Sequence, residues 1–326
     1  MPRIYRVSKK VELLHEAANR GEVEAQLEMA RRSMTGDGVE QDDEIAVMFY
    51  QRAAAQGNTE ALFQLAEILY SNSDLLVYTD REEALVLYQK AANLGHREAQ
   101  YKLGYHFAYS GFMFPEMEEA VKWFEKAADN GHAASQFELG NCYGQGSGVK
   151  QDKAKAVALF REAAKNGNSE AQYGLGFCYA QGEGVAQDKT EAVKWFRLAA
   201  DQKHGEAQYA LCRCYAKGEG IAQDTGQARK FLQSAAENGC HHAQYEYGKM
   251  CPAGEEAIKW LEKAATAGNL AAIIKVHNAY TRGIGVEKNE PLAKIWRQQM
   301  IARGLISLVD TDLGDDFDAD GRWQDL

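Results

Sequence analysis

The hydrophobic residues of this chain follow a helical pattern that recurs along most of its length. In residues 169–203, Ala171, Leu175 and Tyr179 fall four residues apart, which places them on one face of an α-helix. A second apolar stripe follows a glycine-rich stretch and contains Ala192, Trp195, Phe196, Ala199 and Ala200. The pattern therefore predicts two amphipathic helices joined by a turn.

This pair of helices repeats at a fixed spacing. The glutamine of the first helix returns every 36 residues, at Gln100, Gln136, Gln172, Gln208 and Gln244. A period of roughly 20–50 residues is typical of solenoids, in which each unit buries its apolar face only against its neighbours. We therefore expect an all-α solenoid and not a globular domain with a single core.

Extended over the whole chain, the pattern predicts eight helical pairs after a lone helix at residues 9–20. The first helices are expected near 22–35, 59–70, 97–109, 133–145, 169–181, 205–217, 241–250 and 270–282. The second helices are expected near 43–56, 80–94, 116–130, 152–166, 188–202, 224–238, 253–267 and 290–303. We expect three parts: an N-terminal helix in residues 1–21, the repeats in 22–303, and an acidic tail in 304–326.

Glycine-rich motifs separate the two helices of several pairs. Gly182-Glu183-Gly184 follows one first helix, and Asp188 then stands where the next helix needs an N-cap. Similar motifs occupy residues 36–38, 146–148, 218–220 and 283–285. A phosphate-binding loop would follow a strand and open a helix, whereas each of these motifs follows a helix. We therefore interpret them as turns.

The motifs of the repeat resemble those of a known family. Ala-Gln-Tyr-x-Leu-Gly-x-x-Tyr, Gly-x-Gly-Val-x-x-Asp and Ala-x-x-Trp-Phe-x-x-Ala-Ala recur in register over residues 9–303. They are similar to Sel1-like repeats, which are relatives of tetratricopeptide repeats. The resemblance implies a right-handed α-solenoid of about eight repeats that acts as an adaptor or scaffold for other proteins. It implies no shared chemistry, so we expect a protein that is not an enzyme and has no cofactor.

Charge and hydropathy limit the partners and the compartment. The chain has 37 basic and 47 acidic residues, a net charge of −10 that argues against nucleic acid as the main partner. The first residues lack the apolar core of a signal peptide, and no run is long enough to span a membrane. We therefore expect a cytoplasmic protein. Much of the negative charge lies in the tail, because residues 304–326 contain seven Asp and one Arg. We expect it to be a monomer.

The six cysteines predict no disulfide framework in a reducing compartment. Cys142, Cys178 and Cys214 occupy the same helical position in successive repeats, about 10 Å apart by helix packing, which is too far for a disulfide. The resemblance implies a further comparison, because cysteine-rich secreted relatives pair a cysteine late in the second helix with one after the closing turn. Cys240 fits the latter place, but alanines at 235–236 occupy the former.

Two clusters of residues resemble metal-binding motifs, but each lacks part of the motif. Cys240, His241, His242 and Cys251 include adjacent histidines that rarely point the same way, and no Cys-x-x-Cys pair supports them, so we expect no zinc site. Residues 316–321 resemble the first half of a calcium loop, but position 12 of that loop would be residue 327. We expect a solvated acidic tail there. His96, His132 and His204 recur before first helices and are interpreted as turn residues.

The first helices are expected to line the concave face of the solenoid. The positions that should face this groove are Tyr105, His106, Tyr109, Asn141, Gln145, Phe177, Gln181, Arg213 and Lys217. Aromatic rings beside amides suit an extended peptide, whose backbone the amides bind. A second apolar set interrupts the regular turns and contains Leu76, Tyr78, Phe112 and Phe114. These residues either form a partner site or pack on each other as a local cap.

Two functions follow from these features. The first is a non-catalytic adaptor that binds a peptide or helix of a partner protein in its groove. The second is an acidic regulatory or immunity-type protein that occludes a basic effector. Binding by the second should weaken steeply as salt concentration rises. An enzyme that uses the cysteines and histidines is a third reading, for which no usable spacing exists.

Overall fold

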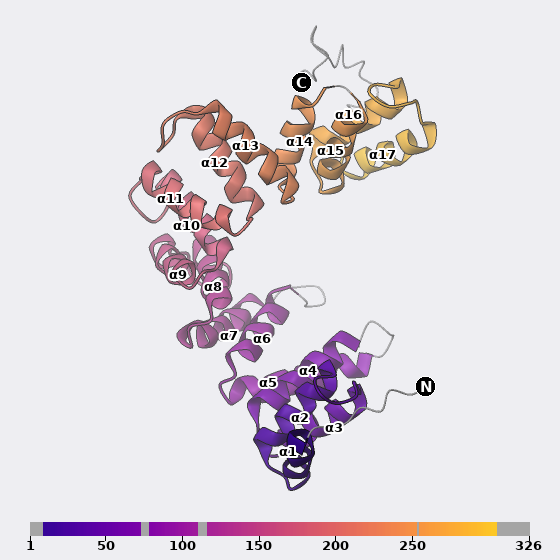
Figure 1. The fold of residues 1–326 in the computed structure, drawn as a ribbon. Helices are drawn as coiled ribbons and strands as arrows, with labels where there is room; N and C mark the ends of the chain where they lie inside the picture. Colours follow the sequence, from indigo (N-terminus) through magenta and orange to yellow (C-terminus); the bar gives the residue numbers. More distant parts are fainter. Residues whose placement is uncertain (1–8, 73–77, 110–115, 253, 305–326) are drawn as a thin grey trace. The chain divides into compact units, whose positions relative to one another are not determined.

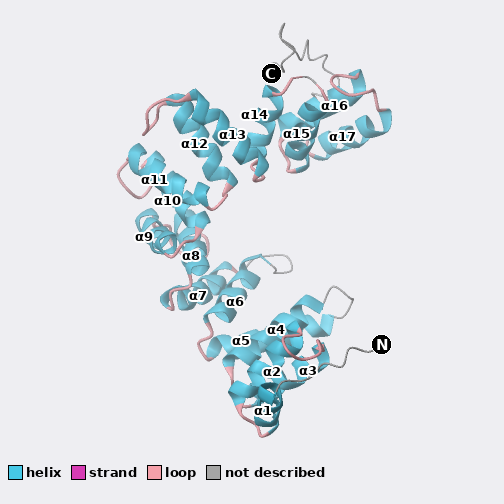
Figure 2. Ribbon diagram, viewed as in Figure 1, coloured by secondary structure: helices cyan, strands magenta, loops and turns pink. Residues whose placement is uncertain are grey.

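The computed structural model describes residues 9–72, 78–109, 116–252 and 254–304, which form seventeen helices (Figure 1). No strand occurs among these residues (Figure 2), so the predicted all-α class is confirmed. Every predicted helix is present, and its ends agree with the prediction to within two residues. The pattern of apolar positions therefore located both members of each pair.

The chain divides into two compact units at residues 159 and 160, and each is described by itself. The first unit contains α1 (Lys9–Asn19), α2 (Val23–Thr35), α3 (Asp43–Ala55), α4 (Thr59–Asn72), α5 (Tyr78–Asn93), α6 (Arg97–Tyr109), α7 (Met117–Asp129) and α8 (Ala133–Gln145). The boundary falls within α9 (Lys153–Lys165). The second unit continues with α10 (Ser169–Gln181), α11 (Lys189–Asp201), α12 (Gly205–Lys217), α13 (Thr225–Glu237), α14 (His241–Met250), α15 (Glu255–Thr266), α16 (Leu270–Arg282) and α17 (Glu290–Ala302).

Within each unit, a helix packs mainly on the helices before and after it in the chain. The core is accordingly a series of small clusters. One contains Met29, Phe49 and Leu65 in the first unit, and another contains Phe196 and Leu211 in the second. This nearest-neighbour packing is the defining property of a solenoid.

Glycine in the first helix makes room for the aromatic residue of the second. A Cβ atom on Gly104 would lie 2.5 Å from Phe124 Cδ1, and one on Gly176 would lie 2.7 Å from Phe196 Cδ1. Both phenylalanines are buried. The helices of a pair therefore approach closely, as the small residues of the sequence predict.

The glycine-rich motifs are turns, which confirms the interpretation from sequence. Gly182 closes α10 in the left-handed conformation, with φ of 75°. The last glycine of the motif is needed for contact, since a Cβ on Gly220 would lie 2.1 Å from the carbonyl oxygen of Lys189. Asp188 then caps α11 by accepting hydrogen bonds from the backbone N–H groups of Thr190 and Glu191.

The recurrent glutamine is buried and joins three helices. Gln172 Nε2 donates to the carbonyl oxygen of Ala164 at the end of α9, at 3.1 Å. Gln172 Oε1 accepts from the amide of Gln202, which caps the end of α11, at 2.8 Å. We call these two hydrogen bonds the glutamine link. The first bond recurs at Gln26, Gln100, Gln136, Gln208 and Gln244.

None of the described helices combines the length and the apolar character that crossing a lipid bilayer demands.

Candidate partner-binding site

Helix α6 carries a row of tyrosine rings. Tyr101, Tyr105 and Tyr109 lie four residues apart, and their successive ring centroids are separated by 6.0 Å and 4.6 Å. Tyr105 is 45% exposed and Tyr109 is 57% exposed. Two large rings are therefore held side by side in solvent, as is typical of a recognition surface.

The opposite face of α6 fixes this row. Leu103 and Gly104 are buried, and Tyr101 packs against Phe124 of α7 at a ring distance of 6.2 Å. Burial raises the pKa of Tyr101 to about 12, so its hydroxyl stays protonated. The row is therefore anchored at one end and exposed at the other.

Tyr109 is also held by the next repeat. Its hydroxyl donates to Glu138 Oε2 of α8 at 2.9 Å. Partial burial raises the pKa of Tyr109, and the hydrogen bond to Glu138 raises it further. The Tyr105 hydroxyl has no hydrogen-bond partner within the described part of the chain. Sequence reasoning missed Tyr101 and Glu138, although the four-residue spacing of the tyrosines was visible.

The other predicted groove residues of the first unit differ in exposure. Gln145 is exposed, whereas Asn141 is only partly exposed. His106 is partly exposed, and its Nδ1 atom is buried without a partner among the described residues. Burial lowers the pKa of His106, which favours the neutral ring. His106 shares its repeat position with the buried Cys142, so this position turns toward the packing interface and away from a ligand.

The predicted residues of the second unit lie on the surfaces of two helices. Phe177 is 44% exposed and stands one turn before the exposed Gln181 on α10. Arg213 and Lys217 are exposed and stand one turn apart on α12. Each pair therefore shares one helical face, and the second unit offers one aromatic position and one basic position.

The recurrent histidines, which we interpreted from the sequence as turn residues, cap helices and also join repeats. Nδ1 of His132 accepts from the backbone N–H of Ser135, and His96 and His204 act likewise on Ala99 and Ala207. Nε2 of each ring lies 3.0–3.1 Å from a glutamate of the preceding first helix, namely Glu60, Glu98 and Glu170. Hydrogen bonding to histidine lowers the pKa of Glu98 and Glu170. Sequence reasoning missed this second contact.

The thiols are poorly suited to chemistry. None of the six cysteines, all of which lie in the described ranges, forms a disulfide, and four of them are buried. Burial raises the pKa of Cys142 and Cys212 to about 11 and that of Cys240 to about 12. A protonated thiol is a weak nucleophile and a weak metal ligand. No group of three or more His, Cys, Asp or Glu residues in the described ranges could hold a metal ion. Cys240 instead caps α14 by accepting from Ala243 N–H at 3.4 Å.

Several predictions concern parts of the chain outside the described residues. These include Leu76, Phe112 and Phe114 of the apolar set and the calcium-like residues 316–321. Tyr78 begins α5, but its side chain lies outside the described part. These assignments stay predictions.

Helical pairs that pack on their neighbours in each unit define an α-solenoid of the helical-repeat class. The Sel1 repeat model matches residues 23–58, 59–96, 97–132, 133–168, 169–204, 205–240, 242–269 and 272–305. The chain therefore belongs to the Sel1 repeat family, as its motifs suggested. Sel1 repeats generally serve as non-catalytic scaffolds for protein–protein interaction.

Two solved structures resemble the chain over most of its length. One is c5321, a protective antigen of uropathogenic Escherichia coli with the SLR fold, at 30% identity and a TM-score of 0.70, covering 94% of this chain and 68% of that one. The other is a Sel1 repeat protein from Oxalobacter formigenes, at 27% identity and a TM-score of 0.68, covering 94% and 92%. A search of curated proteins gave no match.

Proposed function

We propose that this protein is a non-catalytic adaptor that binds a peptide or helix of a partner protein on the tyrosine face of α6, formed by Tyr105 and Tyr109. The observation that carries the proposal is the pair of exposed rings 4.6 Å apart on a helix whose other face is buried. Rigid aromatic rings supply contact area at little entropic cost, which makes them common binding hot spots.

The face favours an apolar side chain flanked by a hydrogen-bond acceptor. The two rings form an apolar platform, and the Tyr105 hydroxyl, which has no hydrogen-bond partner among the described residues, can donate to a backbone carbonyl of the partner. Gln145 adds an exposed amide from α8 of the same unit. The partner segment is therefore an extended or helical stretch with at least one large apolar residue.

The second unit supplies further contacts in this proposal. Phe177 and Gln181 repeat the combination of ring and amide, while Arg213 and Lys217 add positive charge. Six free thiols agree with action in the reducing cytoplasm.

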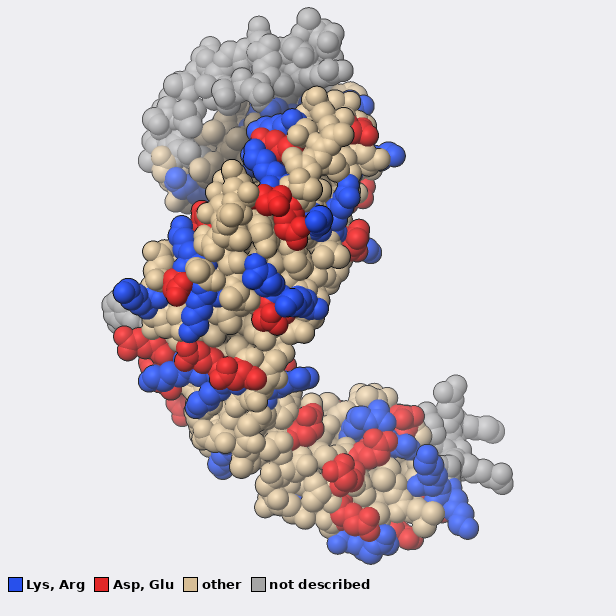
Figure 3. Space-filling view, turned by 90° about the vertical axis from the view of Figure 1, so that its left-hand side faces the viewer, with Lys and Arg blue, Asp and Glu red and all other residues tan. Residues whose placement is uncertain are grey.

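The alternative function, occlusion of a basic effector, has support from the net charge of −10. On the face drawn in Figure 3, however, Lys and Arg side chains alternate with Asp and Glu side chains. Mixed charge of this kind gives no broad acidic field. The face drawn in Figure 3 therefore favours the adaptor.

The proposal can be tested with a peptide selected for binding to the protein. A random peptide library displayed on phage would be selected on the full chain, and the enriched peptides measured by fluorescence polarisation. We expect the double variant Tyr105→Ala, Tyr109→Ala to weaken binding at least about tenfold, which corresponds to one lost hot spot. Val86→Ala is the control, because Val86 is 52% exposed on α5 of the same unit. Equal affinity of the wild type and the double variant would overturn the proposal.

Salt concentration separates the two functions in the same assay. Peptide binding by the tyrosine face should change little between low and high salt, whereas an acidic blocker should lose most of its affinity.

A further inference from the structure

The second bond of the glutamine link recurs in four repeats. The oxygen of the buried glutamine accepts from the side-chain amide that caps the following second helix, in the pairs Gln26–Gln56, Gln100–Asn130, Gln172–Gln202 and Gln208–Asn238. The donor stands 30 residues after the acceptor in each pair, at 2.8–3.2 Å. In the first pair, Gln56 Nε2 also donates to the carbonyl oxygen of Gly21, at 3.1 Å.

The link is incomplete at Gln244. Its Nε2 atom donates to Ala236 O at 3.2 Å, as in the other repeats. The residue that caps α15 is Ala267, whose methyl group donates no hydrogen bond. Gln244 is 7% exposed, and its Oε1 atom is buried with no partner among the described residues. A buried acceptor in this state is costly and favours any ligand that supplies a donor.

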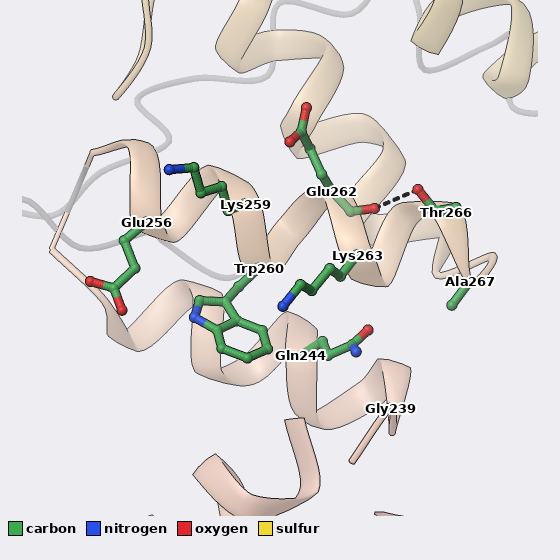
Figure 4. Close-up of a pocket in the computed structure, with 9 residues that line it drawn as sticks. All are labelled: Gly239, Gln244, Glu256, Lys259, Trp260, Glu262, Lys263, Thr266 and Ala267. Atoms are coloured by element: carbon green, nitrogen blue, oxygen red, sulfur yellow. Dashed lines mark hydrogen bonds between the residues drawn. The ribbon is translucent and has the colours of Figure 1, made fainter. Parts of the chain in front are cut away.

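A surface cavity of about 800 Å³, open to solvent and lined by both Gln244 and Ala267, lies where the missing amide would stand. Gln244 and Gly239 line one side, and residues of α15 line the other, including Trp260, Lys263 and Ala267 (Figure 4). Gly239 stands in the turn before α14 as Gly21 stands in the turn before α2. The cavity therefore replaces the side chain that Gln56 places against Gly21 and Gln26.

The lining favours a neutral ligand with an aliphatic part. The Trp260 ring is held edge to face by Tyr247, at a centroid distance of 5.4 Å, and Lys263 Nζ lies 4.0 Å from the Trp260 ring centre. Two lysines and two glutamates line the cavity, so their charges balance. A ligand with a net charge gains little there, whereas an amide on an aliphatic stem matches both the ring and the acceptor.

We propose that this cavity receives an Asn or Gln side chain of a partner polypeptide. The side-chain N–H of the ligand donates to Gln244 Oε1, and its methylene groups lie against Trp260. The ligand thereby supplies from outside the amide that four other repeats carry within the chain. That the amide belongs to a polypeptide rests on the proposed adaptor function, but the cavity itself is tested without a partner.

The first test is a titration of the ¹⁵N-labelled full chain with N-acetyl-glutamine methylamide, followed by NMR at the Gln244 side-chain amide and the Trp260 indole N–H. The capped forms of glutamate and methionine are matched probes, because they have a similar length and the same two backbone amides but lack the side-chain amide. We expect saturable shifts with the capped glutamine and binding at least about tenfold weaker with the other two, because a buried acceptor discriminates against a missing donor. Equal shifts with all three probes would overturn the proposal.

A substitution of Ala267 supplies the second test. Ala267→Gln restores the internal amide, so it should abolish the response to the capped glutamine. Ala267→Met has a similar volume and no donor. We expect the unfolding midpoint of Ala267→Gln to exceed that of Ala267→Met by about 2 °C, because only glutamine satisfies Gln244. Identical midpoints, or a wild-type response in Ala267→Gln, would count against the site. The probe comparison on the wild type needs no variant.

The outcomes of this test and of the peptide assay are distinguishable. Failure of the capped glutamine to bind, with loss of peptide affinity in the tyrosine double variant, removes the amide site and leaves the adaptor function. The reverse pattern keeps the amide site and removes the tyrosine face.

Discussion

His132 and Glu98 join two successive repeats, with His132 Nε2 3.0 Å from Glu98 Oε2. The ring also packs against Tyr101 in a tilted arrangement at a centroid distance of 4.8 Å, while its Nδ1 atom caps α8. One side chain thus serves helix capping, ring packing and a polar contact between repeats. A related arrangement occurs at His204, whose Nε2 lies 3.1 Å from Glu170 Oε2 and whose ring stacks on Tyr173.

This contact predicts a loss of stability in acid. The pKa of Glu98 is lowered in the folded state by its hydrogen bond to His132, so the carboxylate contributes stability above its unfolded pKa. That contribution is lost as the pH falls through the folded pKa. Because the Glu98 side chain is 40% exposed, we expect Glu98→Gln to cost only about 0.5 kcal/mol near pH 6. Urea unfolding between pH 3 and pH 7 measures the effect.

Glu24 provides a matched control for this prediction. It occupies the same position in α2, but the next repeat has Asn58 as its N-cap in place of histidine. Glu24→Gln should leave both the stability and its pH dependence unchanged. A similar loss in both variants would show that the histidine contact contributes nothing.

The close approach of α6 and α7 predicts that Gly104→Ala is destabilising. The new Cβ would lie 2.5 Å from Phe124 Cδ1, and Phe124 is fully buried. We expect a cost of about 1–3 kcal/mol from overpacking. Gly144→Ala is the control, because its Cβ would meet only Ala156 Cβ at 3.7 Å and alanine favours a helix. The thermal unfolding midpoint of Gly104→Ala should lie below that of the wild type, and the midpoint of Gly144→Ala should equal or exceed it.

The glutamine link predicts that removing the side-chain amide of one buried glutamine lowers the stability of the fold substantially. Gln172→Ala leaves the carbonyl of Ala164 and the amide of Gln202 without their buried partner, and we expect a loss of about 1–3 kcal/mol. Gln187 makes a similar bond to Ala180 O at 2.8 Å, but it lies in an exposed turn. Gln187→Ala should cost less than about 0.5 kcal/mol. Chemical denaturation of the two variants compares them, and equal losses would refute a special role for burial.

The thiols are expected to react slowly. Burial raises the pKa of Cys142 to about 11 and that of Cys240 to about 12, so little thiolate exists near neutral pH. Alkylation by iodoacetamide at pH 8 should be at least about a hundredfold slower than for free cysteine. Mass spectrometry over time measures the rate, with the urea-unfolded chain as the control. Rapid modification of one native cysteine would revive the enzymatic reading.

The sequence predicted the helices well because each repeat restates the same local signals. Gly182 stops a helix and Asp188 starts one by interactions within a few residues, which a single chain reveals. Contacts between repeats were harder to predict from the sequence. The 30-residue spacing from Gln172 to Gln202 was visible in the sequence, but its meaning depends on which helix ends meet in space.

The candidate site was predicted only in part, because the sequence reveals local signals but not which helices meet in space. Tyr105 and Phe177 were expected on the surface and are exposed. His106 was expected beside them, yet its ring is partly buried, because helix rotation about a close-packed neighbour decides exposure and the repeat pattern does not give it. The division of the chain at residues 159 and 160 has no compositional signal.

The missing donor at Ala267 has a mechanical consequence. In four other repeats, an amide pair joins the end of the second helix to the first helix beside it, whereas α15 lacks this hydrogen bond to Gln244. When the chain is stretched from its ends in an optical trap, α15 should detach from α14 at a lower force than its counterparts detach from theirs. A ligand bound in the cavity would raise that force, so a bound partner would reversibly strengthen the contact between α14 and α15.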